Sequence, residues 1–370
     1  MMRETRGRTY YPLAAAVLVL LIPFAAPSQT VTSPPQDAAK TYAYWTSART
    51  AAAKPMPLRS VSGVPAAAPA STVRLTGDPV EVAATVPAGI ARGASIPKTA
   101  EVSPMIGAGS TIWYPYPPPF TLSVPVLDYL FVPLFPNTAV GKLYFSGPGG
   151  NFVCSAQSVT SAGSWGAGNR QTVVTAGHCC SDGAGSFYSN WMFQPAHLNG
   201  AAPLGSWAAA VATVYTAWHT GSDLSVDYCA LQMFTLGGKN INDSPTGALG
   251  YAASQPLPQS YVATGWPQAA PFTGGLLFYS SASDAETDTQ QAGLLAFTHG
   301  IGSSMTGGSS GGAWIRKYQS AGAGGPANQF NGLNSYKYTS PSRPDEMFGP
   351  YIETLFVNLL QTVATAPPAP

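Results

Sequence analysis

Residues 307–314 read GGSSGGAW, and with TAGHC at 175–179 and DYCAL at 227–231 they form the pattern that decides what fold we expect. Ser310 lies inside a cluster of glycines. Glycines lack side chains, so backbone N–H groups can point at one spot where a negatively charged oxygen is held. We therefore predict that Ser310 is a nucleophile and that the N–H groups of Gly308 and Ser310 form an oxyanion hole.

The two upstream motifs supply the partners that such a serine needs. TAGHC places His178 at the end of an apolar strand, and DYCAL places Asp227 at the start of another. An imidazole can take the proton of the serine hydroxyl, and a carboxylate can orient the imidazole. Each motif alone is weak, but the order His178, Asp227, Ser310, with each residue in its own local context, predicts a catalytic triad.

A second aspartate competes for the acid role. Asp223 lies in the turn-like stretch HTGSDLS, where aspartate is usually a loop or capping residue, so we favour Asp227. We expect His197 and His219 at surface loops. No trio of histidines has the spacing of a zinc site, and we expect neither a metal nor a cofactor.

The order of the candidate catalytic residues along the chain excludes two other hydrolase classes. Gly308–Gly312 matches the GxSxG elbow of lipases and esterases, but that class has its histidine after the serine, and every histidine here precedes Ser310. Subtilisin-like order needs an aspartate before the histidine. The nearest one, Asp128, lies in a proline-rich stretch.

TAGHC, DYCAL and GGSSGGAW resemble the three motif blocks of the trypsin/chymotrypsin superfamily, particularly its secreted microbial members, over about residues 139–365. The resemblance implies an all-β fold of two packed six-stranded antiparallel β-barrels, with the triad in the cleft between them. It also implies hydrolysis of peptide bonds in protein or peptide substrates through an acyl-enzyme. The alternative is a catalytically inactive relative that binds a partner through the same cleft, against which the intact His, Asp and Ser argue.

One helix is predicted near the end of the chain. Its apolar residues recur at spacings of three and four, which is typical of an amphipathic helix docked on strands; they are Ile352, Leu355, Phe356, Leu359, Leu360 and Val363.

The four cysteines are expected in disulfides. Cys179 and Cys180 are neighbours, with Cα atoms about 3.8 Å apart, below the usual disulfide range, so Cys154 must reach one of them and Cys229 the other. The resemblance implies that Cys154 pairs with Cys179, which leaves Cys180 for Cys229.

The sequence also departs from the family pattern. Ser309 stands where the family usually has an aspartate, so activation by an ion pair between that aspartate and a new N-terminus is not expected. Ser304 stands where trypsin carries its specificity aspartate, and Asn334 stands where glutamate-specific relatives have a histidine before Ser335. We take Ser304 and Ser335 as substrate-binding residues and expect no preference for basic or acidic side chains.

The N-terminal third differs in composition from the rest. Residues 1–28 combine a basic start, an apolar run and small residues suited to cleavage, so we predict a signal peptide and a secreted, extracellular protein. The run is shorter than the about 20 residues that span a bilayer, so no stable membrane association is expected. Residues 29–137, rich in Ala, Pro, Ser and Thr, are predicted to be a low-complexity propeptide or linker. YWTSARTAAAKP, within them, resembles the propeptides of microbial enzymes.

The remaining boundaries and partners follow from composition. Residues 138–366 are assigned to the peptidase domain and residues 367–370 to a disordered tail. Charged residues make up 9% of the chain and the formal net charge is +1. Such a balance gives no electrostatic reason to bind nucleic acid. We expect a monomer whose partners are its substrates.

Overall fold

The computed structural model describes residues 29–63, 67–69, 77–87, 120–126, 134–243, 245–288, 296–320, 326–339 and 344–370. The predicted signal peptide, residues 1–28, lies outside the described residues. None of the helices within the described ranges is long and apolar enough to cross a membrane.

Six antiparallel strands close into a barrel in the first half of the predicted peptidase domain. They follow one another in space as β11-β10-β7-β8-β9-β12, and β12 pairs back with β11. Closure leaves no free edge along most of the sheet. The strands are β7 (Val140–Gly147), β8 (Gly150–Ser158), β9 (Thr172–Thr175), β10 (Ser189–Pro195), β11 (Trp207–Tyr215) and β12 (Cys229–Met233).

The second half of the domain forms the other sheet, with strands in the order β19-β20-β16-β15-β14-β17-β18-β13. Only Asn334 and Ser335 separate β18 from β19, and these strands pair with β17 and β20 respectively, so the sheet curls back on itself. The expected all-β, chymotrypsin-like two-barrel fold is confirmed. The strands are β13 (Gly250–Ala253), β14 (Ser260–Gly265), β15 (Phe278–Asp288), β16 (Thr298–Gly302), β17 (Ala313–Arg316), β18 (Gln329–Leu333), β19 (Tyr336–Tyr338) and β20 (Glu346–Pro350).

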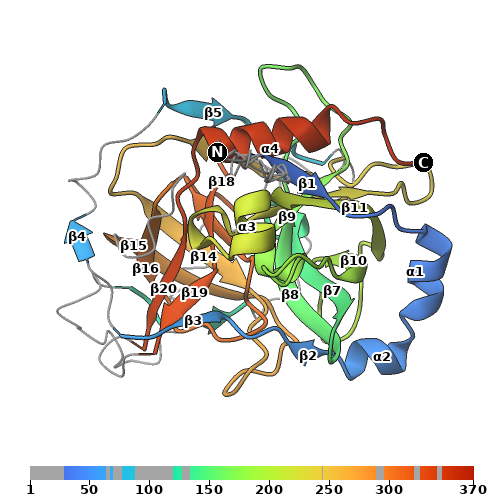
Figure 1. Ribbon diagram of the computed structural model, residues 1–370, viewed down its shortest axis with the longest axis horizontal. Coiled ribbons are helices and arrows are strands. Elements are labelled where there is room, and N and C mark those ends of the chain that lie inside the picture. The colour runs from blue at the N-terminus through green and yellow to red at the C-terminus, as the bar shows by residue number, and fades with distance from the viewer. Residues whose placement is uncertain are drawn as a thin grey trace, which may run out of the picture.

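The predicted C-terminal helix is confirmed as α4 (Thr354–Ala364), which contacts strands of both sheets (Figure 1). Its buried face includes Phe356, Leu359, Leu360 and Val363, the residues whose spacing predicted it. A shorter helix, α3 (Thr216–Gly221), follows β11 directly.

The tail at residues 367–370 was expected to be disordered, and the structure shows it bound to the first barrel instead. Gln232 Nε2 donates to the carbonyl of Pro367 at 2.6 Å, and Gln171 Nε2 donates to that of Ala369 at 2.7 Å. Both bonds end on backbone carbonyls of the tail, and proline keeps its carbonyl acceptor although it has no N–H. A proline-rich composition therefore did not reveal this attachment.

The described parts of residues 29–137 add short elements to the outside of both sheets (Figure 1). Helices α1 (Ala38–Tyr44) and α2 (Ser47–Ala51) precede most of the strands. Strands of two or three residues are too short to show a period, which explains why the sequence suggested no regular structure here. They are β1 (Thr30–Thr32) on β11, β2 (Lys54–Pro55) on β8, β3 (Arg59–Val61) on β19, β4 (Ala67–Pro69) and β6 (Val124–Pro125) on β15, and β5 (Val80–Val82) on β13.

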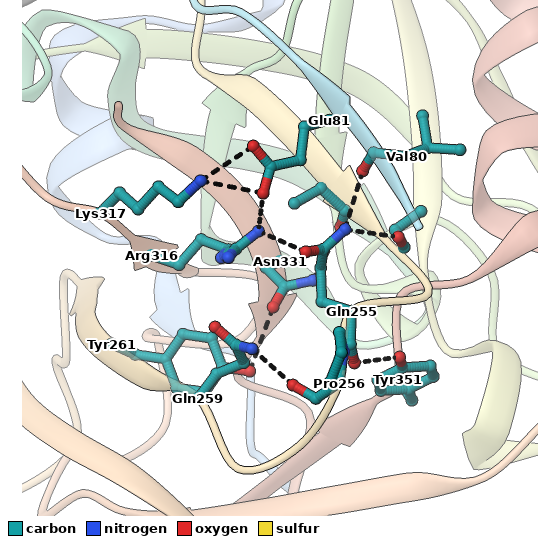
Figure 2. Close-up of polar contacts among 12 residues, drawn as sticks. Val80, Glu81, Gln255, Pro256, Gln259, Tyr261, Arg316, Lys317, Asn331 and Tyr351 are labelled. Carbon is teal, nitrogen blue, oxygen red and sulfur yellow. Dashed lines mark hydrogen bonds and ion pairs between the residues drawn. The ribbon is translucent and has the colours of Figure 1, made fainter. Parts of the chain in front are cut away.

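An ion-pair cluster fixes β5 to the second sheet, as Figure 2 shows. The Glu81 carboxylate accepts from Arg316 Nη1 at 2.7 Å and from Lys317 Nζ at 2.8 Å. Gln255 joins the cluster by accepting from Arg316 at 2.8 Å and donating to the carbonyl of Val80 at 3.2 Å. Because Arg316 is 7% exposed, Glu81 supplies a partner for a nearly buried charge.

Two disulfides tie the first barrel together. Cys154 is bonded to Cys179 and Cys180 to Cys229, the pairing that the resemblance implied. The second bond joins the segment that carries His178 to the start of β12.

The double substitution Cys180→Ser/Cys229→Ser removes the second disulfide. It is expected to lower the free energy of unfolding by about 4 kcal/mol, because the bond joins residues 49 positions apart and so restricts the unfolded chain. Urea unfolding of the full chain, followed by tryptophan fluorescence, measures the difference. An unchanged midpoint and slope would show that the bond does not constrain the unfolded state.

Candidate active site

His178 and Asp227 are joined by two hydrogen bonds. The backbone N–H of His178 donates to Asp227 Oδ1 at 2.7 Å, and His178 Nδ1 lies 2.8 Å from Asp227 Oδ2. A short 3-10 turn after β9 carries the histidine, and the aspartate directly follows another such turn before β12. The carboxylate therefore fixes both the position of the histidine backbone and the orientation of its ring.

Asp227 is fully buried and accepts a further hydrogen bond at 2.5 Å from Ser335 Oγ, between β18 and β19. Burial by itself would raise the pKa of the Asp227 carboxyl, but the charge of His178 and the hydrogen bonds from His178 and Ser335 hold that pKa below its ordinary value. The carboxylate is thus ionised and can stabilise a positive charge on the imidazole.

The loop that carries Ser310 lies beside the turn that carries His178. The carbonyl of Ser310 accepts from the N–H of Ser155 at 2.8 Å and lies 3.9 Å from Cys179 Sγ. Among the residues that the structure describes, neither Ser310 Oγ nor His178 Nε2 has a hydrogen-bond partner, so the structure shows no bond between them. Catalytic hydrogen bonds of this kind are often long until a substrate is bound.

Two glycines of the loop have conformations that other residues rarely adopt. Gly308 has φ +95° and Gly311 has φ +80°. A Cβ on Gly308 would lie 2.9 Å from the carbonyl oxygen of Trp266, and one on Gly311 would lie 2.2 Å from Thr175 Oγ1. The loop therefore needs glycine at both positions, at Gly308 to approach the segment that follows β14 and at Gly311 to approach the first barrel.

Sequence reasoning missed two residues that hold this loop. Asn334 Nδ2 donates to the carbonyl of Ser309 at 3.1 Å, and the backbone of Asn334 bonds to Gly311 and Gly312. Ser155 Oγ donates to the carbonyl of Gly308 at 3.0 Å. Neither has a local signal in the sequence, although Asn334 directly precedes Ser335.

Ser304, one of the two predicted substrate-binding residues, lines a cavity of about 830 Å³. Its Oγ accepts from the N–H of Ser123 in the N-terminal region at 2.9 Å. Lys337 lies in the wall of the same cavity and donates to the carbonyls of Ser303 at 2.7 Å and Pro344 at 2.9 Å. Burial lowers the pKa of Lys337 to about 8. Ser335, the other predicted residue, is buried against Asp227.

The expectation that His197 and His219 lie at surface loops was wrong, because both side chains have polar partners inside the fold. His197 is 2% exposed with Nδ1 2.9 Å from Gln194 Oε1, and burial lowers its pKa to about 3. His219 is 8% exposed with Nδ1 2.7 Å from Ser181 Oγ.

Within the described part of the chain, one group of possible metal-ligating side chains comes together, formed by Cys154, His178 and Cys179. The two sulfur atoms are bonded to each other, so they are not the thiolates that bind zinc.

Comparisons with solved structures support the fold. No protein-family model and no curated protein sequence matches the chain. Among solved structures, the protease Anisep from Arthrobacter nicotinovorans is 37% identical, with a TM-score of 0.54, over 62% of this chain and 97% of its own. The thermostable serine protease AL20 from an extremophilic microorganism is 36% identical, with a TM-score of 0.54, over 62% of this chain and 99% of its own.

Proposed function

This chain belongs to the trypsin/chymotrypsin-like serine peptidases, and from that premise we propose that it is a secreted endopeptidase in which His178, Asp227 and Ser310 form the catalytic triad. The observation that carries the proposal is the buried, hydrogen-bonded pair of His178 and Asp227 beside the loop of Ser310. The chemistry is acyl transfer to the serine and then to water.

In the first half of the reaction, Ser310 Oγ attacks the carbonyl carbon of a peptide bond while His178 Nε2 takes the hydroxyl proton. Asp227 accepts the hydrogen bond from Nδ1–H, which leaves Nε2 as the basic nitrogen and stabilises the imidazolium that forms. The N–H groups of Gly308 and Ser310 hold the developing oxyanion. His178 then gives its proton to the leaving amine, and an acyl-enzyme remains.

In the second half, water attacks the acyl-enzyme and gives its proton to His178 Nε2. The carbonyl–Oγ bond breaks, the proton returns to Ser310, and a carboxylic acid leaves. No other group is needed to balance the reaction.

The proposed organisation of the chain has two supports. The two solved peptidases each cover 62% of this chain, a share about as large as residues 138–366, the proposed peptidase domain. The two disulfides support export, because such bonds persist in oxidising compartments. On this proposal residues 1–28 are a signal peptide and residues 29–137 a propeptide, with Ser304 and Ser335 in the substrate site.

A fluorophosphonate probe tests for the nucleophile. The processed protein is expected to be labelled on Ser310, and Ser310→Ala is expected to abolish labelling, as measured by in-gel fluorescence and peptide mass spectrometry. Ser309→Ala is the matched control and should keep the label, since Ser309 Oγ donates to the carbonyl of Thr306 at 2.8 Å. An unlabelled wild type would support the inactive, partner-binding alternative.

Two aspartate variants test the acid. Asp227→Asn is expected to lower kcat by about four orders of magnitude, because an amide leaves the imidazole in the wrong tautomer. Asp223 instead accepts from Ser225 N–H at 2.9 Å and caps the 3-10 turn before Asp227. Asparagine caps as well as aspartate does, so Asp223→Asn should keep most of kcat and nearly all of the stability. Steady-state kinetics on a peptide substrate decide, and equal losses in the two variants would contradict the assignment.

A further inference from the structure

Residues 54–61 of the N-terminal region cross the proposed active site from one sheet to the other. β2 pairs in parallel with Phe152 and Val153 of β8, and β3 pairs in parallel with β19. In Figure 1 this blue segment runs from α2 past β2 to β3 beside β19. The segment therefore touches both walls of the cleft that should receive a substrate.

The sheet edges that it covers are otherwise free within the described structure. β9 pairs with β8 only at Gln157 and Ser158, and β20 lies on the opposite side of β19 from β3. An extended peptide can add to an unpaired edge through main-chain hydrogen bonds. The protein thus presents two edges for an extended peptide, and its own residues occupy them.

The centre of the segment lies at the proposed oxyanion hole. The N–H of Gly308 donates to the carbonyl oxygen of Met56 at 2.9 Å, and the N–H of Met56 donates to the carbonyl of Val153 at 2.9 Å. A Cβ on Gly307 would lie 3.0 Å from the same Met56 oxygen. One of the two N–H groups proposed to stabilise the reaction is therefore already occupied.

Arg59 fixes the far end beside the triad. Its guanidinium lies 5.1 Å from the ring centroid of Trp218, whose ring is 6.2 Å from that of His178. Arg59 Nη2 donates to the carbonyl of Asp182 at 2.9 Å, and the N–H of Arg59 donates to the carbonyl of Ser335 at 3.3 Å.

We propose that residues 54–61, which we call the strap, are an inhibitory segment that this chain binds in its own active-site cleft. This inference rests on the proposed function of the site. It explains why His178 and Ser310 are both 0% exposed although a substrate must reach them. It also gives removal of the N-terminal region a specific effect, which is to free the Gly308 N–H and the two sheet edges.

The sequence of the strap suits an inhibitor better than a substrate. The bond that follows the Met56 carbonyl has Pro57 as its leaving group, and a proline nitrogen carries a ring carbon where other residues carry hydrogen. Pro55 and Pro57 also restrict the free strap, which reduces the entropy lost on docking.

Anchors on both sides keep the strap close to the cleft. Upstream, Trp45 is buried against the first barrel, and its Nε1 donates to the carbonyl of Asn190 at 2.6 Å. Downstream, Glu81 is bound by Arg316 and Lys317 (Figure 2). Attachment of this kind makes docking intramolecular, so modest contacts suffice for high occupancy.

The reactivity of Ser310 in the unprocessed chain tests the proposal. Arg59→Ala removes the contact with Trp218 and the hydrogen bond to Asp182, so the rate of fluorophosphonate labelling of the full-length band is expected to rise about tenfold. Arg49→Ala is the matched control. Arg49 also stacks on an aromatic ring, at 4.3 Å from Tyr44, and donates to a carbonyl at 2.7 Å, but outside the cleft. Its labelling rate should equal that of wild type. A wild-type band that labels as fast as Arg59→Ala would overturn the strap and leave the triad standing.

A second measurement does not need an active enzyme. In the full-length Ser310→Ala chain, hydrogen exchange at the amides of Met56, Arg59 and Gly308 is expected to be slow, and adding Arg59→Ala should accelerate it about tenfold. Adding Arg49→Ala should leave it unchanged. Exchange across residues 54–61 at the rate of an unstructured peptide would overturn docking whether or not Ser310 reacts. Slow exchange in a protein that no variant makes reactive would support docking and count against the triad.

Discussion

The rest of the structure depends on one buried charge. Asp227 is fully buried, and an ionised carboxylate without partners would cost several kcal/mol in such a place. Its hydrogen bonds come from the backbone and ring of His178, beside β9, and from Ser335, between β18 and β19. Because these donors belong to different barrels, the two barrels have to meet at this point for the carboxylate to be satisfied. The Cys180–Cys229 disulfide holds the two segments of the first barrel that contribute to it.

The loop that carries Ser310, the proposed nucleophile, differs from Asp227 in its hydrogen bonding. Its backbone is held by Ser155 and Asn334, and its glycines allow close contact with the first barrel. Yet Ser310 Oγ and His178 Nε2 are buried and have no partner among the described residues. An unsatisfied buried polar atom costs about 1–3 kcal/mol, a cost that the surrounding hydrogen bonds have to offset. The two groups proposed to react thus have no competing hydrogen bonds among the described residues, while Ser155 and Asn334 hold the backbone beside Ser310.

The N-terminal region uses the same physical opportunity that a substrate would use. Its short strands add to sheet edges that the two barrels leave unpaired, and the strap does so next to the proposed oxyanion hole. Low complexity did not prevent this, because main-chain hydrogen bonds do not depend on the side chain. Trp45 before the strap, and Glu81 after it, supply side-chain contacts that fix this region to the two barrels.

The amino-acid sequence by itself determined the family, the all-β class, the C-terminal helix and the residues of the candidate triad. These features have local signatures, since a serine on a tight turn needs glycines around it and a docked helix repeats its apolar residues every three or four positions. Only the tertiary structure decided what supports the site and what covers it. Ser335 reaches Asp227 across 108 positions, and Arg59 reaches Asp182 across 123. Contacts over such distances leave no periodic or spaced pattern, because the fold rather than the neighbouring sequence brings the two atoms together.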